Sequence, residues 1–354
     1  MRVLIVDDSA FMRTALANMF RADGGWDVRT ARDGNEALVA TREFDPDVVT
    51  LDVNMPGMDG LTCLSHIMTE SPRPVVMVSS LTTEGATSTL EALAMGAVDF
   101  VPKPSGTVSL DVKSIGAEIV ERVRCAAGSK RNRRVIQRRA VAKRPAPAPS
   151  TQTPARPGLV VIGCSTGGPR ALEDVVAELP ADFPLPIVVA QHMPAGFTKA
   201  LADRLDTITP LNVVEVDGMV PLRPGVIAIG KGDADVIVSR RGDTLRAVSV
   251  PTDSRYGWHP SVDRLVTSAG ALLAPEEVFG VLMTGMGNDG ARTLADLKRR
   301  GAYTIAESEQ SCVVFGMPGS LVQLHGATTV LPSDAIGKHL SRTVKARRIP
   351  DGAG

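Results

Sequence analysis

The sequence predicts an α/β protein with two doubly wound parallel-sheet domains joined by a flexible linker. In two separate regions, short apolar runs of strand length alternate with segments of helical spacing, which is typical of parallel sheets covered by helices. A basic, proline-rich stretch without acidic residues separates the two regions. The length of 354 residues is enough for two domains, each with its own core.

The composition indicates an ordinary soluble globular protein of the reduced cytoplasm, which we expect to be a monomer. Hydrophobic residues make up 44% of the chain, and the formal net charge is zero, so nothing global favours nucleic acid or an anionic membrane as a partner. No apolar run approaches the roughly 20 residues of a membrane span, and acids at positions 7 and 8 come too early for a signal peptide. The four cysteines lack C-x-x-C spacing, so neither zinc nor a disulfide framework is expected.

The first region, residues 1–125, is expected to hold five buried strands with helices between them. The strands are expected at Val3–Val6, Val28–Ala31, Val48–Leu51, Val75–Val78 and Asp99–Val101. Between the first two strands, Phe11–Phe20 places its large apolar residues on one side of a helix. This alternation predicts a doubly wound, flavodoxin-like domain.

Residues 126–157 are expected to form the linker. From Ser129 to Gly158 the chain has many Arg, Lys and Pro residues, no acids and few large apolar side chains. Such a stretch buries too little apolar surface to offset the entropy of ordering, which favours an extended tether with polyproline II character. Contact of its cations with nucleic acid is the alternative, and a solvated linker is the preferred interpretation.

Residues 158–345 repeat the alternation and predict a Rossmann-like domain, followed by a disordered tail at 346–354. Six strands are expected at Leu159–Ile162, Ile187–Ala190, Asn212–Val216, Val226–Ile229, Val278–Met283 and Tyr303–Ala306. The segment Ala234–Val250 is expected to form an antiparallel hairpin that turns at residues 241–243.

Acidic residues follow two strands of the first region. Asp7 and Asp8 end the first strand and Asp52 ends the third, while Ser79 ends the fourth and Lys103 follows the fifth. A parallel sheet brings these strand ends to one edge, where three carboxylates repel one another unless a cation lies among them. Mg²⁺, which prefers oxygen ligands, suits such a site. Ordinary solvated loop acids are the alternative for any one residue and explain the whole set poorly.

The same residues resemble a response-regulator receiver domain over about residues 1–125. The resemblance is carried by Val-Asp7-Asp8-Ser, by Leu51-Asp52-Val-Asn54-Met-Pro-Gly-Met-Asp-Gly60 and by Asp-Phe100-Val-Pro-Lys103-Pro104. It implies that a partner histidine kinase phosphorylates Asp52. It also implies Mg²⁺ on Asp8, Asp52 and the backbone carbonyl of Asn54, with Asp7 alongside, Ser79 and Phe100 as switch residues, Lys103 at the site, and a cis Lys103–Pro104 bond.

The stretch Leu159–Pro169 runs from a buried strand through a small-residue turn into a helix. It places Ser165 at the carboxyl end of a strand and beside a helix N-terminus, where α/β sheets bind ligands. Three interpretations compete. A structural turn is always available, a phosphate cradle lacks both G-x-G-x-x-G and a P-loop lysine, and a nucleophilic serine in G-x-S-x-G needs a base and an orienting acid elsewhere.

His192 and Asp289 are the candidate partners of Ser165. His192 follows the next buried strand, which should lie beside the Ser165 strand. Asp289 follows a third strand, in a Gly-rich turn before the helix at Ala291–Arg299. Considered alone, Asp289 is expected to be a helix N-cap. Considered together with Ser165 and His192, it favours a Ser–His–Asp site. The other histidines, except His259, are expected to be structural.

Four motifs of this region resemble the catalytic domain of the CheB family of chemotaxis protein-glutamate methylesterases and glutamine deamidases. They are Gly-Cys-Ser165-Thr-Gly-Gly-Pro, Gln-His192-Met-Pro, Thr-Gly-Met286-Gly-Asn-Asp289-Gly-Ala and Ser311-Cys-Val-Val-Phe-Gly-Met-Pro318. Cys164 stands where that family has an alanine-like residue. A Cys164 nucleophile is the alternative to Ser165.

The resemblance implies a role for each matching residue. Ser165 attacks a glutamyl methyl ester or a glutamine, His192 transfers the proton, and Asp289 orients His192. Backbone N–H groups near Met286 and His192 stabilise the oxyanion. Thr166 is expected beside the site, and His259 is either an active-site neighbour or structural.

The implied function is phosphorylation-activated hydrolysis of glutamate methyl esters, and deamidation of glutamines, on chemoreceptors. The unphosphorylated receiver is expected to block the active site until Asp52 is phosphorylated. The esterase chemistry needs no cofactor, and Mg²⁺ serves the receiver alone. Two rivals stay open: a phosphorylation-gated binding module without chemistry, and a receiver-controlled DNA-binding regulator, whose only support is the basic linker.

Overall fold

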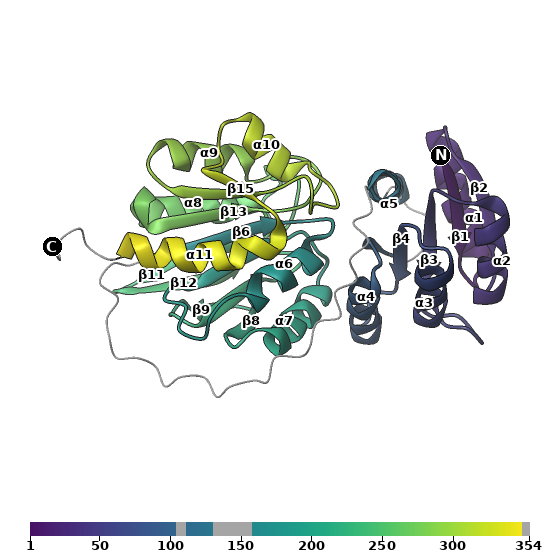
Figure 1. Cartoon of the computed structure of the whole chain (residues 1–354), viewed down its shortest axis with the longest axis horizontal. Coiled ribbons are helices and arrows are strands. Elements are labelled where there is room, and N and C mark those ends of the chain that lie inside the picture. Colours follow the sequence, from purple (N-terminus) through teal and green to yellow (C-terminus); the bar gives the residue numbers. More distant parts are fainter. Residues whose placement is uncertain (104–110, 130–157, 349–354) are drawn as a thin grey trace. The chain divides into compact units, whose positions relative to one another are not determined.

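The protein divides into two compact units, Met1–Ile136 and Gln137–Gly354. The computed structural model describes residues 1–103, 111–129 and 158–348 (Figure 1). Most of the expected linker and the Lys103–Pro104 bond therefore lie outside the described residues. Helix α5 (Asp111–Gly128) continues three residues past the expected domain end at 125.

The five strands of the first unit form a parallel sheet in the order β2–β1–β3–β4–β5. They are β1 (Arg2–Val6), β2 (Asp27–Ala31), β3 (Val48–Asp52), β4 (Val75–Ser79) and β5 (Asp99–Pro102), and the helices are α1 (Ala10–Asp23), α2 (Gly34–Phe44), α3 (Gly60–Glu70), α4 (Thr83–Met95) and α5. Each strand differs from its sequence prediction by at most one residue at either end. The predicted flavodoxin-like order is confirmed.

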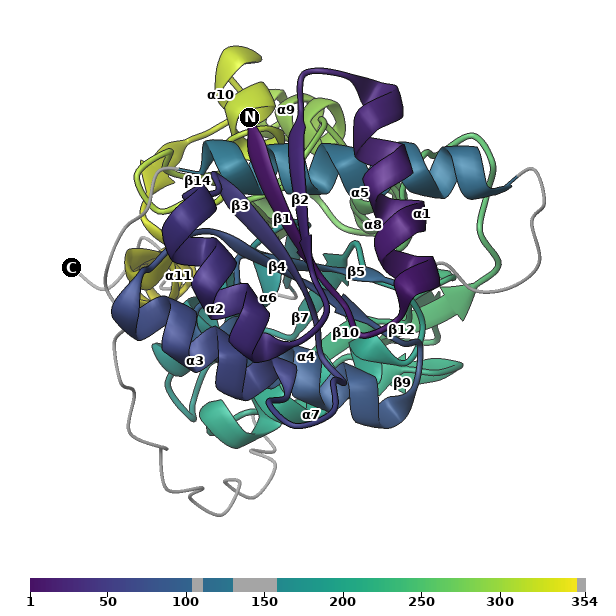
Figure 2. The ribbon, with the colours of Figure 1, turned by 90° about the vertical axis from the view of Figure 1, so that its right-hand side faces the viewer.

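Helices cover both faces of this sheet. Figure 2 shows α1 and α5 together on one face, and α2, α3 and α4 follow one another along the other. The core between the sheet and the first pair is built from fully buried Ile5, Leu16 and Phe20. Burial on both faces is why these strands read as continuous apolar runs. Their carboxyl ends, with Asp7, Asp52 and Ser79, meet at one edge.

The second unit has a seven-stranded parallel sheet in the order β15–β14–β13–β6–β7–β10–β8. The strands are β6 (Leu159–Cys164), β7 (Ile187–Gln191), β8 (Asn212–Val216), β10 (Val226–Gly230), β13 (Val278–Leu282), β14 (Tyr303–Glu307) and β15 (Thr329–Leu331). A separate antiparallel sheet, in the order β11–β12–β9, contains the predicted hairpin as β11 (Asp235–Arg241) and β12 (Thr244–Val250), with β9 (Met219–Pro221) added.

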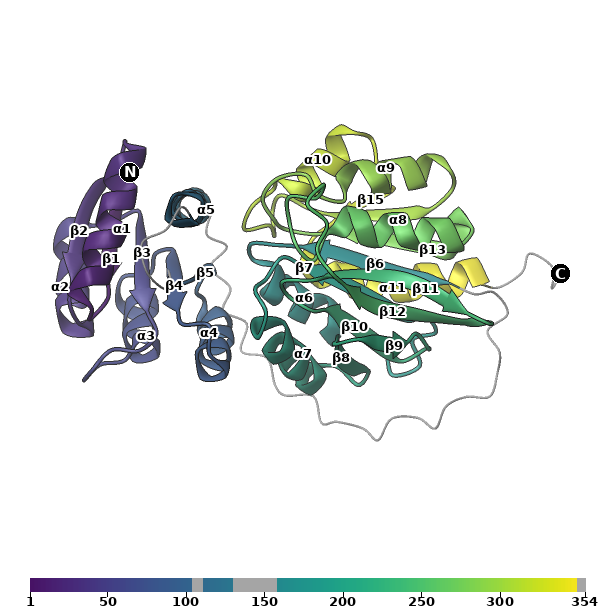
Figure 3. The same cartoon turned by 180° about the vertical axis from the view of Figure 1, so that it is seen from behind.

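Two groups of helices cover the large sheet, on opposite faces (Figures 1 and 3). The first group is α6 (Gly168–Ala177), α7 (Phe197–Ile208) and α11 (Ser333–Arg348), and the second is α8 (Val262–Leu272), α9 (Ala291–Arg299) and α10 (Met317–Gln323), with the short 3₁₀ helix η1 (Pro275–Glu277) before β13. The small sheet packs its hairpin against α8.

The C-terminal helix corrects one expectation. Helix α11 runs to Arg348, so residues 346–348 are helical, and the tail expected from residue 346 begins no earlier than 349. The Arg347 guanidinium lies 4.8 Å from the centroid of the Tyr303 ring, a cation–π contact that holds the last turn. Residues 349–354 lie outside the described part of the chain.

The strand order reverses at β6, which pairs with β7 on one side and with β13 on the other. On one side of β6 the chain forms β7, then the edge strand β8, and then β10 between them, and on the other side it forms β13, β14 and β15 in turn. The carboxyl ends of strands at such a switch point form the ligand-binding crevice of open α/β sheets. Ser165 follows β6 at this point.

Candidate active site and phosphorylation site

The turn that carries Ser165 is fixed by its own backbone. The Ser165 N–H donates to the carbonyl of Thr284 at 2.9 Å, and the Gly168 N–H donates to the carbonyl of Ser165 at 2.7 Å. Gly167 has φ 78°, in the left-handed region that favours glycine, and helix α6 begins at the next residue. The turn therefore presents Ser165 at the end of β6 in the manner expected for G-x-S-x-G.

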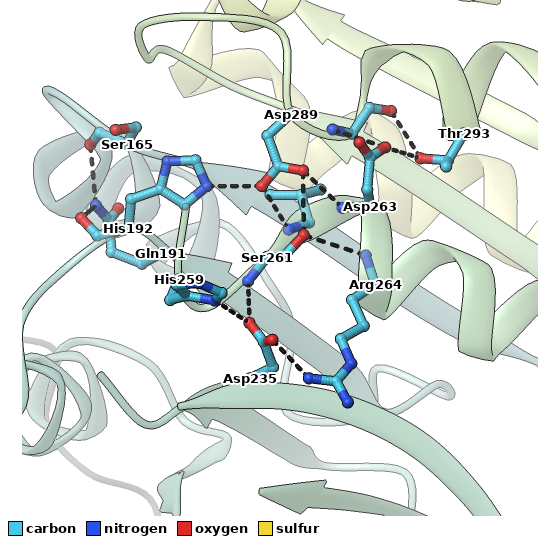
Figure 4. Close-up of polar contacts among 12 residues, drawn as sticks. Ser165, Gln191, His192, Asp235, His259, Ser261, Asp263, Arg264, Asp289 and Thr293 are labelled. Carbon is cyan, nitrogen blue, oxygen red and sulfur yellow. Dashed lines mark hydrogen bonds and ion pairs between the residues drawn. The ribbon is translucent and has the colours of Figure 1, made fainter. Parts of the chain in front are cut away.

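His192 is buried directly after β7 and contacts Asp289. Its Nε2 lies 2.9 Å from Oδ2 of Asp289, and since a carboxylate only accepts, Nε2 carries the proton. Nδ1 is then an acceptor, and it has no hydrogen-bond partner among the described residues. A flipped ring would turn Cε1 toward Asp289, so this orientation is fixed. In Figure 4 Ser165 lies on the far side of the His192 ring from Asp289.

Asp289 is held at the N-terminus of helix α8. Its carboxylate accepts the N–H groups of Val262 at 2.7 Å and Asp263 at 2.9 Å, and the hydroxyl of Ser261 at 3.3 Å (Figure 4). Burial alone would raise its pKa, but the hydrogen bond and charge of His192, with the two backbone donors, lower it below the ordinary value. Asp289 is therefore ionised.

The alternative that Asp289 caps the helix that follows it is wrong. Helix α9 begins after Gly290, and its N-cap makes no side-chain hydrogen bond. Asp289 instead accepts hydrogen bonds from the N-terminus of α8, a helix that precedes it in the chain. One carboxylate thus binds a helix N-terminus and the imidazole of His192 at once.

Gln191 joins the backbones of Ser165 and His192, and the sequence did not single it out for a role. Its Nε2 donates to the carbonyl of Ser165 at 3.0 Å and to that of His192 at 3.1 Å, in a fully buried position. A flipped amide would set oxygen against two carbonyl oxygens, so the orientation follows from the contacts. The one sequence feature that could have pointed to Gln191 is its position as a polar residue at the end of a buried apolar strand.

Thr284, two residues after the end of β13, holds the same turn from the other side. Its hydroxyl donates to the carbonyl of Thr166 at 2.9 Å and accepts the N–H groups of Val313 and Val314. Its carbonyl receives the Ser165 N–H, as described above. Both Gln191 and Thr284 act through backbone groups, which sequence patterns do not reveal.

Three backbone N–H groups beside Ser165 are candidate oxyanion donors, and two of them are available. The N–H groups of Thr166 and Met286 donate to no other group in the part of the chain that the structure describes. The N–H of His192, by contrast, donates to the carbonyl of Cys164 at 3.0 Å. The N–H of His192 is therefore taken up by the β6–β7 pairing, which continues through that residue, and the expectation of a donor near His192 stays a prediction.

His259 lies outside the Ser165–His192–Asp289 contacts. Its Nδ1 lies 2.9 Å from Oδ1 of Asp235, which also accepts the Ser261 N–H, while Arg264 pairs with the other oxygen at 2.7 Å. These contacts fix the loop before α8. The neighbouring Trp258 stacks on the ring of His192, with centroids 5.6 Å apart and planes 9° from parallel.

Cys164 is unsuited to act as the nucleophile. Its side chain is fully buried at the end of β6. Burial, with the negative charge of Glu307, raises the pKa of its thiol well above the ordinary value. Since the thiolate is the reactive form, the structure favours Ser165 over the Cys164 alternative.

The acidic cluster of the first unit gathers as expected. Carboxylate oxygens of Asp7, Asp8 and Asp52 all lie within 4.8 Å of one another. Lys103 Nζ lies 2.7 Å from Asp52 and 3.2 Å from Asp7. Burial, and next the charge of Asp7, raise the pKa of Asp52 despite the opposing effect of Lys103. A divalent cation would relieve this repulsion, so the residues present fit Mg²⁺.

Asn54, Ser79 and Phe100 are the other residues of the first unit that were expected to serve this site. The Asn54 N–H donates to Oδ1 of Asp52 at 3.2 Å. The Ser79 hydroxyl donates to the carbonyl of Gly85 at 3.1 Å, at the start of α4. The Phe100 side chain is buried, with 3% of its surface exposed. Ser79 is thus bonded away from Asp52 in this state.

The fold and the two sites define a class of protein: a hydrolase with an α/β fold that carries its own receiver domain. The family described as CheB methylesterase matches residues 160–340, and the family described as response regulator receiver domain matches residues 3–113. The chain belongs to the CheB methylesterase family.

Similar proteins cover nearly the whole chain. A protein of Rhodospirillum rubrum named protein-glutamate methylesterase/protein-glutamine glutaminase 3 is 52% identical, over 96% of this chain and 95% of its own. One of Rhodopseudomonas palustris, with the same name but numbered 2, is 51% identical over 95% and 96%. The crystal structure of the Thermotoga maritima CheB methylesterase catalytic domain is 38% identical and covers 53% of this chain and 99% of its own, with a TM-score of 0.51.

The described residues contain no helix with the length and apolar character that a membrane crossing requires.

Proposed function

We propose that this chain hydrolyses glutamate 5-methyl esters, and deamidates glutamines, on chemoreceptors, with Ser165 as nucleophile. The observation that carries the proposal is the buried contact between His192 and an ionised Asp289, which leaves Nδ1 of His192 as an acceptor on the side of Ser165. The membership in the CheB methylesterase family and the names of the relatives support the substrate class.

The chemistry follows from these groups. Nδ1 of His192 takes the hydroxyl proton as Ser165 Oγ bonds to the ester carbonyl carbon, and Asp289 stabilises the imidazolium that forms. Collapse of the tetrahedral intermediate breaks the ester C–O bond, and His192 returns the proton to the departing methanol. Water then repeats both steps on the acyl-enzyme, which releases the glutamate and restores Ser165. With glutamine the leaving group is ammonia.

The oxyanion binds to the backbone N–H groups of Thr166 and Met286, which have no other acceptor in the described residues. Thr166 is the residue after the nucleophile, whose N–H commonly serves this role at such a turn. In one studied protease, each oxyanion donor is worth about 3–4 kcal/mol.

The receiver controls access to this site. A histidine kinase phosphorylates Asp52, and Lys103 pairs with the added anion. Asp8, Asp52 and the Asn54 carbonyl, with Asp7 alongside, would hold Mg²⁺, which would offset the negative charge of the phosphoryl group. The Ser79 hydroxyl then turns from Gly85 to the phosphoryl group and Phe100 repacks. The unphosphorylated receiver blocks the active site, and the protein works in the cytoplasm.

The test is methanol release from receptor membranes that carry methyl esters. We expect release by the intact protein to rise with a phosphodonor and Mg²⁺, and Ser165→Ala to abolish it under all conditions. Receptor binding without release by the intact protein would instead support the phosphorylation-gated binding module. The contact between His192 and Asp289 speaks against that rival, because a binding module needs no general base.

A further inference from the structure

A second carboxyl group lies under the nucleophile turn and takes no part in the chemistry above. Glu307 is the last residue of β14, two strands from β6, and its side chain has no exposed surface. It forms no ion pair with any lysine or arginine of the described residues. A fully buried acid without a cation is costly, which calls for a function or a neutral form.

Glu307 holds Thr284 and, through it, the turn. Its Oε2 accepts the Thr284 N–H at 2.8 Å. Thr284 in turn receives the Ser165 N–H on its carbonyl at 2.9 Å and binds the Thr166 carbonyl through its hydroxyl at 2.9 Å. The side chain of Glu307 is therefore two hydrogen bonds from the backbone of the nucleophile.

The other oxygen of Glu307 is held by a second set of contacts. Oε1 lies 2.8 Å from Ser311 Oγ, which also accepts the N–H of Ser333 at 3.1 Å. The Ser311 hydroxyl donates to Oε1 when Glu307 is ionised, and a neutral Glu307 donates its own proton from Oε1 to Ser311 Oγ. The Ser333 hydroxyl donates to Asp174 of α6 at 2.6 Å. The position of Glu307 is thus fixed from both sides of the turn.

We propose that Glu307 is a positioning residue for the nucleophile: as a neutral carboxyl it holds Thr284, and through Thr284 the backbone of Ser165 and Thr166, in the geometry of the transition state. The proposal rests on the proposed function, because it concerns the same reaction. Glu307 touches neither substrate nor His192, so it is not a catalytic residue.

The groups that face Glu307 favour the neutral form. Burial, with the negative charge of Asp174, raises the pKa of Glu307 to about 7, against the lowering by the Thr284 N–H and the Ser311 hydroxyl. Cys312 and Cys164 are the other titratable groups beside it, and the charge of Glu307 raises the thiol pKa of both.

Ionisation of Glu307 opposes the reaction. The charge of an ionised Glu307 acts on the thiol of Cys164, which is the residue before Ser165. The tetrahedral intermediate on Ser165 is itself an anion. A second negative charge buried nearby, on Glu307, therefore raises the free-energy barrier to forming it. Catalysis then needs His192 without its extra proton and Glu307 with its proton, which gives a pH profile that rises and then falls.

The experiment compares the full-length protein with Glu307→Gln and Glu307→Met, each with Mg²⁺ and a phosphodonor, by methanol release from pH 6 to 8.5. Gln keeps an oxygen for the Thr284 N–H and cannot ionise. We expect equal kcat for wild type and Glu307→Gln at pH 6, and about tenfold higher kcat for Glu307→Gln at pH 8.5. The ratio at each pH cancels the effect of pH on the receiver and on His192.

Glu307→Met removes the acceptor, and we expect kcat to fall about tenfold or more at every pH while KM changes little. Thr284→Val, which keeps the backbone groups and removes the hydroxyl, should show the same kcat loss. If Glu307→Gln follows the wild-type profile across the range, the inference is wrong even if Glu307→Met fails to fold. Wild-type protein without Ser165-dependent release would instead overturn the proposed function.

Discussion

Two buried carboxyl groups of the second unit have opposite ionisation states because their donors differ. Asp289 receives the imidazole N–H and two N–H groups at a helix N-terminus, and these favour its charge. An ionised Glu307 would receive only one N–H and one hydroxyl, with the charge of Asp174 nearby, and the cost of burial therefore remains dominant. Environment, and not residue type, assigns the two acids to different tasks.

The pKa of Glu307 makes stability depend on pH in a defined direction. Between its ordinary value of 4.5 and about 7, the folded protein holds a proton that the unfolded chain has released, so the free energy of unfolding falls as pH rises. The loss is complete above pH 7 and amounts to about 3 kcal/mol. Glu307→Gln should therefore melt at a higher temperature than wild type at pH 8 and at the same temperature near pH 4.5, by calorimetry of the second unit's transition. Equal melting at both pH values would contradict a buried neutral Glu307.

Asp289→Asn should lower kcat by about 10³–10⁴-fold, because an amide cannot hold the imidazole in the tautomer that leaves Nδ1 as acceptor. Methanol release at saturating receptor measures it. Loss of the carboxylate at the N-terminus of α8 should also lower the free energy of unfolding by about 1–3 kcal/mol.

Asp206→Asn is the matched control for that variant. Asp206 lies in α7, and its carboxylate accepts the Val213 N–H of β8 at 3.0 Å. We expect a comparable fall in melting temperature with kcat within about twofold of wild type. A similar kcat loss in both variants would mean that Asp289 acts through stability alone.

Among the elements, helix α8 contributes most to the site. Ser261 is its N-cap and accepts the Arg264 N–H at 3.3 Å, while the first turn presents free N–H groups to Asp289. Asp235 of β11 fixes the loop that leads into the helix, and so the small antiparallel sheet supports the triad without touching it. The orientation of His192 is therefore set by an element more than 60 residues downstream of it.

Gly168 at the start of α6 tests how tightly the turn is packed. A Cβ there would lie 2.0 Å from Oε1 of Gln191 and 3.0 Å from Cβ of Cys164, although its backbone conformation suits any residue. Gly168→Ala should displace the Gln191 amide from the Ser165 carbonyl and lower kcat by about 10²-fold. Gly257→Ala, where a Cβ meets open space, should keep wild-type methanol release. Full activity of Gly168→Ala would show that Gln191 is dispensable.

The sequence predicted the long elements well, because buried parallel strands are continuous apolar runs. Strands β9 and β15 were missed, since three residues carry no periodicity. The positions of Ser165, His192 and Asp289 at strand ends also followed from the alternation. Gln191, Thr284 and Glu307 could not be assigned roles, because their contacts are with backbone groups whose placement only the fold decides.

At the scale of the whole molecule, each unit concentrates its polar chemistry at the carboxyl ends of a parallel sheet. In the first unit, Lys103 already pairs with Asp52, so the site is prepared for an anion before phosphorylation. In the second, the strand order reverses at β6 beside Ser165. One architecture thus serves phosphoryl acceptance and ester hydrolysis.

Removal of Mg²⁺ is expected to abolish activation by the phosphodonor and to leave the basal esterase rate in place. With EDTA, the rise in methanol release that a phosphodonor causes should disappear, because Asp7, Asp8 and Asp52 lose the cation that offsets their charge. The basal rate should stay within about twofold, since Ser165, His192 and Asp289 need no metal.

Asp52→Ala is the control, and it should match the EDTA result in the presence of Mg²⁺. Deletion of residues 1–157 should raise the rate and make it insensitive to both treatments. Loss of the basal rate with EDTA, or an inert deletion variant, would argue against a receiver that only restrains the esterase.

The stack of Trp258 on His192 also has an optical consequence. The chain has two tryptophans, one in each unit, and Trp26 packs edge-on against Phe20 in the first. In a Trp26→Phe protein, all indole emission comes from the ring that lies against the imidazole of His192. A positive charge placed on that face changes the emission of the indole, so the fluorescence of this variant responds to events on the His192 ring.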